Sequence, residues 1–169
     1  MIVEIVSTGT ELLLGQIVNT NAPYLARKLN ELGYDAVYQT TVGDNRRRMA
    51  SVMAIALERA DIVITSGGLG PTQGDITKEV SAELLGLPLL LHEESVEHIR
   101  NFFARRQLTM TNNNLRQAMM PEGAIVVTNH RGTAPGVIIE HGEKTIIHLP
   151  GPPMELEHMF ETSILPYFA

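Results

Sequence analysis

The sequence contains no cysteine and no tryptophan, and only 5% of its 169 residues are aromatic. Without cysteine the chain can form no disulfide, has no thiol nucleophile and cannot bind zinc through thiolates, a composition that favours a cytoplasmic protein. The net charge of −6 and the scarcity of aromatic side chains are the opposite of what a typical nucleic-acid-binding surface requires. We therefore expect no disulfide framework and no nucleic-acid partner.

Long apolar runs are missing as well. The longest, residues 84–91, contains Gly86 and Pro88 and is far too short to span a bilayer. The first six residues carry Glu4 and no basic residue, unlike the start of a secretory signal. With 44% hydrophobic and 19% charged residues, the composition is that of a globular protein, and we expect no membrane role.

Predicted strands and helices alternate along almost the whole chain. Short apolar runs predict strands, and apolar residues at helical spacing predict the helices between them, which indicates a parallel sheet covered by helices in one α/β domain over residues 1–169. Strands are predicted at 2–7, 34–42, 61–65 and 124–128, and an antiparallel hairpin at 136–140 and 144–149. Helices are predicted at 19–32, 46–60, 75–86 with Asp75 as N-cap, 93–106, 112–119 and 153–168.

A glycine-rich segment, "TSGGLGPTQGDIT" (residues 65–77), connects the third predicted strand to the following helix. Glycines allow backbone N–H groups to turn toward an anion, and a helix N-terminus adds partial positive charge. The segment therefore predicts a phosphate-binding loop, although it is neither a G-x-G-x-x-G nor a Walker A motif. The alternative is that the glycines serve only a tight connection.

Acidic side chains follow each of the first three predicted strands. Ligands of open parallel sheets bind beyond the carboxyl ends of the strands, so Glu11, Asp44 and Asp75 are expected on one rim. Carboxylates repel phosphates, and a divalent cation such as Mg²⁺ resolves the conflict. We predict that Asp44 and Asp75, with Glu11, bind the metal, the alternative being that the two aspartates are ordinary caps. The predicted phosphate contacts are Thr8, Gly9, Thr10, Ser66, Gly67, Gly68, Gly70, Thr72 and Thr77.

Arg46 is a further candidate for contact with a ligand. It stands in the first turn of a predicted helix, where a positive charge opposes the helix dipole and a bound phosphate would relieve that repulsion. The alternative interpretation of the run Arg46-Arg47-Arg48 is a solvated helix face.

Five segments, taken in order, resemble a known family. They are "STGTELLLGQIVNTN" (7–21), "GDN" (43–45), "TSGGLGPTQGDIT" (65–77), "GTAPG" (132–136) and "LPGPPMEL" (149–156). Together they resemble the N-terminal domain of the CinA family, competence/damage-inducible protein A, within the molybdopterin-binding superfamily. The resemblance covers essentially the whole chain. Molybdopterin adenylyltransferases usually carry Gly-Gly-Thr-Gly and lack the Pro-Gly-Pro-Pro element.

The resemblance implies a three-layer α/β/α fold with a mostly parallel sheet and one antiparallel hairpin. It also implies an ADP-ribose pyrophosphatase that forms AMP and ribose 5-phosphate with a divalent metal (Mg²⁺ or Co²⁺) and is stimulated by K⁺. In that scheme Asp44 and Asp75 carry the catalysis, and Gly132, Gly136, Gly151 and Pro152 close around sugar or base, unless they are simple turns. A homo-oligomer, dimer or trimer, is expected.

The sequence departs from the family pattern at Gly74, where CinA-type sequences usually carry the first of two adjacent acids. Many members also carry a C-terminal nicotinamide-mononucleotide deamidase domain, to which no part of these 169 residues corresponds. Two alternatives to hydrolysis stay open: a non-catalytic domain that binds a nucleotide or molybdopterin, and a molybdopterin adenylyltransferase.

Overall fold

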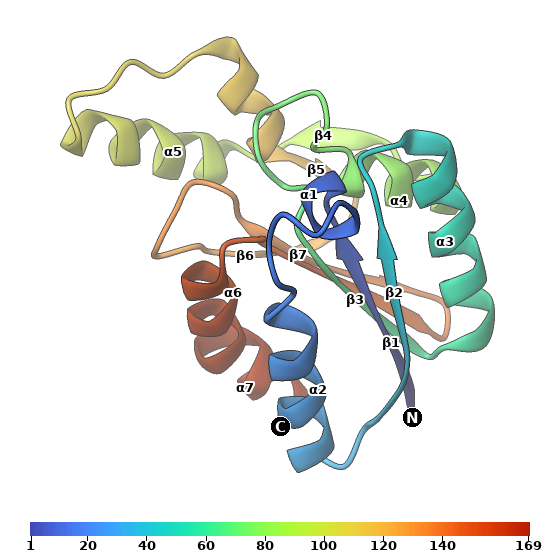
Figure 1. Ribbon diagram of the computed structural model, residues 1–169. Coiled ribbons are helices and arrows are strands. Elements are labelled where there is room, and N and C mark those ends of the chain that lie inside the picture. The colour runs from blue at the N-terminus through green and yellow to red at the C-terminus, as the bar shows by residue number, and fades with distance from the viewer.

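A six-stranded sheet forms the centre of the computed structural model, which describes all residues from 1 to 169 (Figure 1). The strand order is β2-β1-β3-β8-β7-β6. The first four of these strands run parallel, and β7 pairs antiparallel with both β8 and β6. The strands are β1 (Ile2–Thr8), β2 (Asp35–Val42), β3 (Ile62–Ser66), β6 (Ile125–Val127), β7 (Gly136–His141) and β8 (Lys144–Leu149).

Helices cover both faces of this sheet, as Figure 1 shows. The alternation along each strand sends Ile5 and Ile64 to one face, where they pack with Phe160, and Val6 and Val63 to the other. The first face is covered by α2 (Asn21–Glu31), α6 (Pro153–Met159), the π-helical turn η2 (Phe160–Ile164) and α7 (Leu165–Phe168). The second is covered by α3 (Arg46–Arg59) and α4 (Thr77–Leu85). The predicted three-layer α/β/α fold is confirmed.

A smaller unit is attached beside the main sheet. It contains β4 (Leu89–Leu91) paired antiparallel with β5 (Met119–Pro121), α5 (Glu93–Arg105) and the 3₁₀ helix η1 (Asn112–Ala118). Its own small core contains Val96, Ile99 and Ala118. Figure 1 shows α5 standing apart from the two helical layers. None of the helices in the structure is both long and apolar enough to cross a bilayer.

The structure corrects several predicted elements. The strands β4 and β5 were not predicted, because runs of three residues beside Pro88 and Pro121 carry no recognisable period. The segment expected as a helix at 112–119 is a 3₁₀ helix, and a short helix α1 (Thr10–Leu13) was missed. The prediction of Asp75 as an N-cap was wrong: α4 begins at Thr77 after Ile76, without a side-chain cap.

A completely buried histidine lies under α4. The Nδ1 atom of His148 on β8 is 2.7 Å from Thr65 Oγ1 on the neighbouring β3, whereas its Nε2 atom has no hydrogen-bond partner. Burial, with a smaller contribution from the nearby Lys78 charge, lowers the pKa of His148 to about 3. The folded protein therefore keeps this imidazole neutral at pH values where an exposed histidine is charged.

This difference predicts a loss of stability in acid. Between the ordinary pKa of 6.5 and about 3, the unfolded chain binds a proton that the folded chain does not, so the free energy of unfolding decreases as the pH falls through this range. Replacing His148→Gln should reduce the loss between pH 7 and pH 4 by about 3 kcal/mol. Urea denaturation at several pH values measures it, and His141→Gln at the exposed end of β7 is the control. Equal pH dependence in wild type and His148→Gln would contradict the prediction.

Candidate functional site

A cleft of about 660 Å³ opens at the carboxyl ends of the parallel strands. The loops after β1, β2, β3 and β8 form its walls, together with residues from α5, η1 and the loop that precedes β7. This is the expected place for a ligand of an open parallel sheet. The predicted site residues that line the cleft are Thr8, Gly9, Glu11, Asp44, Ser66, Gly67, Gly68, Gly70, Asp75, Gly132, Gly151 and Pro152.

Gly67 and Gly68 stand at positions where a Cβ atom would collide with neighbouring residues. Both have positive φ angles, +94° and +73°. A Cβ atom on Gly67 would lie 2.7 Å from the carbonyl oxygen of Thr8, and one on Gly68 would lie 1.8 Å from Thr77 Oγ1. The Cα of Gly67 would also lie only 3.3 Å from a Cβ placed on Gly151. The glycines therefore allow the loops after β1, β3 and β8 to pack backbone against backbone.

The amide groups of this loop divide into two sets. The N–H of Gly67 donates to the carbonyl oxygen of Leu149 over 3.0 Å and so serves the packing. The N–H groups of Gly68, Leu69 and Gly70 donate to no group of the protein, although all three residues line the cleft. Three such amides at the edge of a cleft are suited to an anionic ligand.

The threonine hydroxyls hold the loops together. Thr8 Oγ1 donates to the carbonyl oxygen of Ser66 over 3.0 Å, and Thr77 Oγ1 donates to that of Gly67 over 3.1 Å. Thr77 is fully buried and does not line the cleft. Nor do Thr10, Thr72, Arg46 and Gly136, the last of which packs against Met159.

Asp44 and Asp75 both face the cleft but differ in their local bonds. Asp75 Oδ2 accepts from the N–H of Thr72 (2.9 Å) and from its hydroxyl (2.6 Å), so this aspartate closes the preceding turn and does not cap α4. Asp44 Oδ2 is 3.5 Å from the N–H of Thr10, while Thr10 Oγ1 accepts from the Asp44 N–H over 3.1 Å. The Oδ1 atom of each carboxylate makes no hydrogen bond in the structure and is available to a ligand.

The third predicted acid, Glu11, folds over Gly9, where a Cβ atom would lie 2.5 Å from Glu11 Oε1. No three side chains of His, Cys, Asp or Glu gather closely enough to form a metal site by themselves. Two carboxylates are nevertheless a normal protein contribution to a Mg²⁺ site that phosphate oxygens and water complete. The residues present fit a metal that is bound together with a phosphorylated ligand.

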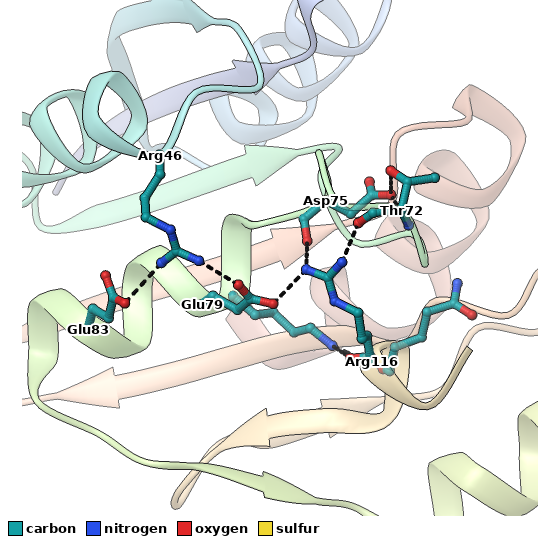
Figure 2. Close-up of polar contacts among 8 residues, drawn as sticks. Arg46, Thr72, Asp75, Glu79, Glu83 and Arg116 are labelled. Carbon is teal, nitrogen blue, oxygen red and sulfur yellow. Dashed lines mark hydrogen bonds and ion pairs between the residues drawn. The ribbon is translucent and has the colours of Figure 1, made fainter. Parts of the chain in front are cut away.

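Arg46 does not contact the cleft. Figure 2 shows its guanidinium between Glu79 and Glu83 of α4, at 2.7 and 2.9 Å. Glu79 is also 2.7 Å from Arg116 of η1. Partial burial alone would raise the pKa of Glu79, but the hydrogen bonds and charges of Arg116 and Arg46 hold it below its ordinary value. The carboxylate of Glu79 therefore stays charged and joins two arginines.

Several residues of the cleft were not predicted as site residues. Asn21 and Glu155 lie in segments whose motifs were recognised: Asn21 Nδ2 donates to the carbonyl oxygen of Gly151 (2.8 Å), and Glu155 accepts from Asn129 (2.7 Å). Phe102, Gln117 and Arg131 come from the attached unit and the loop before β7. No sequence signal points to these three, because their place in the cleft depends on how the attached unit packs.

Comparison with known proteins agrees with this fold and site. The sequence model of the family described as "Probable molybdopterin binding domain" matches residues 4–169. The crystal structure of the protein CinA of Thermoplasma acidophilum, described as having unknown function, has a TM-score of 0.91 and 32% identity and covers 98% of both chains. This chain belongs to the CinA family of molybdopterin-binding domains. The recognition made from its motifs is confirmed.

Two further relatives define how far the likeness extends. A CinA-like protein of Dictyoglomus thermophilum is 55% identical over 164 residues, which are 97% of this chain but 40% of that protein. The CinA-type chain thus spans about 40% of the length of such relatives. The molybdopterin biosynthesis enzyme MoaB of Thermus thermophilus has a TM-score of 0.64 at 20% identity, over 98% of this chain and 89% of that one, and shares the fold alone.

The packing of the glycine loop predicts different costs for two alanine substitutions. Gly68→Ala combines a positive φ with a Cβ that collides with Thr77, whereas Gly142→Ala in the β7–β8 turn has a φ of +60° and nothing within 4 Å. We expect Gly68→Ala to lower the free energy of unfolding by at least about 2 kcal/mol more than Gly142→Ala. Chemical denaturation of both variants measures the difference. Equal losses would mean that Thr77 moves aside without cost.

Proposed function

We propose that this CinA-type domain hydrolyses a nucleoside diphosphate sugar, ADP-ribose to AMP and ribose 5-phosphate, with a divalent metal ion, Mg²⁺ or Co²⁺, and with K⁺ as a stimulating ion. The observation that carries the proposal is that one cleft contains both carboxylates, which suit a metal ion, and unpaired amides, which suit an anion. The carboxylates of Asp44 and Asp75 line the same cleft as the unpaired amides of Gly68, Leu69 and Gly70.

The size and charge of the cleft support this choice. A volume of about 660 Å³ suits a ligand with two sugar rings and a diphosphate. Its ionisable lining consists of the carboxylates Glu11, Asp44, Asp75 and Glu155 and the single cation Arg131. Such a lining repels a diphosphate unless a cation accompanies it, which is why we include a metal.

The residues of the cleft have separable tasks in this proposal. Amides of the glycine loop bind the phosphoryl oxygens and stabilise the charge that develops on them. Asp44 and Asp75 hold the divalent ion, which when bound neutralises the diphosphate and lowers the pKa of water. Glu155, which also lines the cleft, has a carboxylate that can accept from hydroxyl groups of a ribose.

A second candidate, binding without catalysis, is favoured by one observation. Gly74 stands where CinA-type sequences usually carry an acid, and a Cβ built on it lies 3.4 Å from Asp44 Cβ. An acid at this position would therefore lie beside Asp44, and its absence removes one potential metal ligand. No observation at the site favours the third candidate, molybdopterin adenylylation.

The test is incubation of the purified chain with ADP-ribose, Mg²⁺ or Co²⁺, and K⁺, followed by chromatography for AMP. Metal-dependent AMP supports the hydrolase. ADP-ribose that binds in calorimetry without forming AMP supports the binding domain. A chain that neither binds nor cleaves ADP-ribose excludes both, and formation of adenylylated molybdopterin from ATP would identify the transferase. Light scattering in the same preparation tests the proposed dimer or trimer.

Removing either aspartate charge should stop the reaction. We expect Asp44→Asn and Asp75→Asn each to lower the rate of metal-dependent AMP formation at least about 100-fold, because an amide binds a divalent cation far more weakly than a carboxylate. Initial rates over a range of metal concentrations measure the effect. Asp35→Asn, an exposed aspartate at the opposite end of β2, is the control. Rates near wild type in both variants would remove the proposed metal site.

Restoring an acid at position 74 should strengthen metal binding. The nearest atoms to a Cβ at Gly74 lie at ordinary contact distance, so a Cβ at this position fits beside Asp44 without a collision. We expect it to lower the metal concentration for half-maximal rate roughly tenfold, because one more carboxylate joins the metal shell. A matched Gly74→Asn variant separates added charge from added volume. An equal effect of both substitutions would exclude a metal ligand at this position.

A further inference from the structure

The guanidinium group of Arg116 lies directly against the turn that carries Asp75 (Figure 2). It donates to the carbonyl oxygen of Thr72 (2.7 Å) and to that of Asp75 (3.3 Å), and it pairs with Glu79 (2.7 Å). Arg116 belongs to η1, more than forty residues along the chain from Thr72 and outside the main sheet. One side chain of the attached unit therefore contacts both ends of this turn.

The turn depends on this contact because its remaining bonds are internal. The N–H of Asp75 donates to the carbonyl oxygen of Thr72 (3.1 Å), and the Asp75 carboxylate accepts from Thr72. These bonds fix the shape of the turn, and its C-terminal side is anchored by the buried Ile76 and Thr77, but they do not hold the Thr72 side in place. The planar guanidinium, with several donors in fixed directions, supplies that second constraint.

The end of η1 is held in return by Lys78 of α4. The Nζ atom of Lys78 donates to the carbonyl oxygens of Arg116 (3.2 Å) and Gln117 (3.0 Å), and the side chain is buried. Burial, aided by Arg116 and opposed by Glu79, lowers the pKa of the Lys78 amine to about 8. At neutral pH the group is mainly protonated, so both contacts are charge-assisted. These two bonds therefore fix the backbone of residues 116 and 117 to α4.

The same network reaches the loop of Asp44. Glu79 pairs with Arg116 through Oε1 and with Arg46 through Oε2. Arg46 is the first residue of α3 and follows Asp44 after a single residue, Asn45. A chain of alternating charges, Glu83–Arg46–Glu79–Arg116, consequently connects the segment of Asp44 to the turn of Asp75 (Figure 2).

We infer that Arg116 is a positioning residue of the cleft: through the two carbonyl oxygens of the 72–75 turn and through Glu79, it sets the position of Asp75 relative to Asp44. The inference rests on the proposed function insofar as the two carboxylates act on one ligand. It makes Arg116 a residue that touches neither metal nor substrate yet determines whether both aspartates can bind the same ion.

Amide hydrogen exchange tests the positioning without any ligand. In Arg116→Met we expect the hydrogen-bonded amides of this segment, those of Thr72, Asp75 and Thr77, to exchange at least about tenfold faster, because charge-assisted bonds to two carbonyl oxygens are lost. Arg116→Lys, which keeps the charge but cannot span both oxygens, should be intermediate. Arg100→Met is the matched control, since Arg100 forms an exposed pair with Glu97 within α5. If Arg116→Met fails to fold, Glu79→Gln is used in its place, because it removes the ion pair between Glu79 and Arg116.

Ligand measurements complete the test. We expect Arg116→Met to raise the Co²⁺ concentration for half-maximal AMP formation roughly 10- to 100-fold with an unchanged thermal midpoint, and Arg116→Lys to recover part of it. If the wild type forms no AMP, the hydrolase proposal fails, and the affinity for ADP-ribose in the presence of Co²⁺ replaces the rate as the readout. If ADP-ribose does not bind either, the exchange rates alone decide whether Arg116 positions the turn. Unchanged exchange at 70–77, or faster exchange with unchanged metal dependence and affinity, overturns the inference.

Discussion

The close contact of backbones around Gly67 is the constraint on which the cleft depends. Three loops from β1, β3 and β8 meet there: a Cβ on Gly67 would collide with the carbonyl oxygen of Thr8, and a Cβ on Gly151 would lie 3.3 Å from the Cα of Gly67. Any side chain at Gly67 would separate these loops. The walls of the cleft are therefore formed by the same backbone contacts that pack the strand ends together. These contacts also hold the free amides of residues 68–70 at the edge of the cleft.

The sequence predicted the sheet, the two helical layers and the position of the cleft, because all three follow from strand and helix periods and from parallel topology. It also predicted Asp44 and Asp75 as cleft residues, since each follows directly on a strand end or a glycine loop. The prediction failed for Arg46. Its attraction to Glu79 and Glu83 depends on the packing of α3 against α4, which no local pattern records.

The structure of the attached unit could not be predicted from the sequence. Its strands have three residues each, and its 3₁₀ helix lacks the period of an α-helix. Arg116 is an ordinary arginine in sequence, and its role depends on a turn more than forty residues away. Motif analysis does not find residues that act through others for this reason, whereas a glycine-rich loop and aspartates after strand ends can be recognised from the sequence alone.

The central position of β8 has a consequence for the order of folding. Residues 145–149 pair with residues 62–66, so the middle of the sheet is completed only by a contact across some eighty positions. Such long-range pairing is slow compared with local structure because a long loop must close first. During synthesis, a chain that ends before β8 has β1, β2 and β3 but lacks the cleft residues Pro150, Gly151, Pro152, Pro153 and Glu155. The cleft therefore stays incomplete until the segment after β8 has been made.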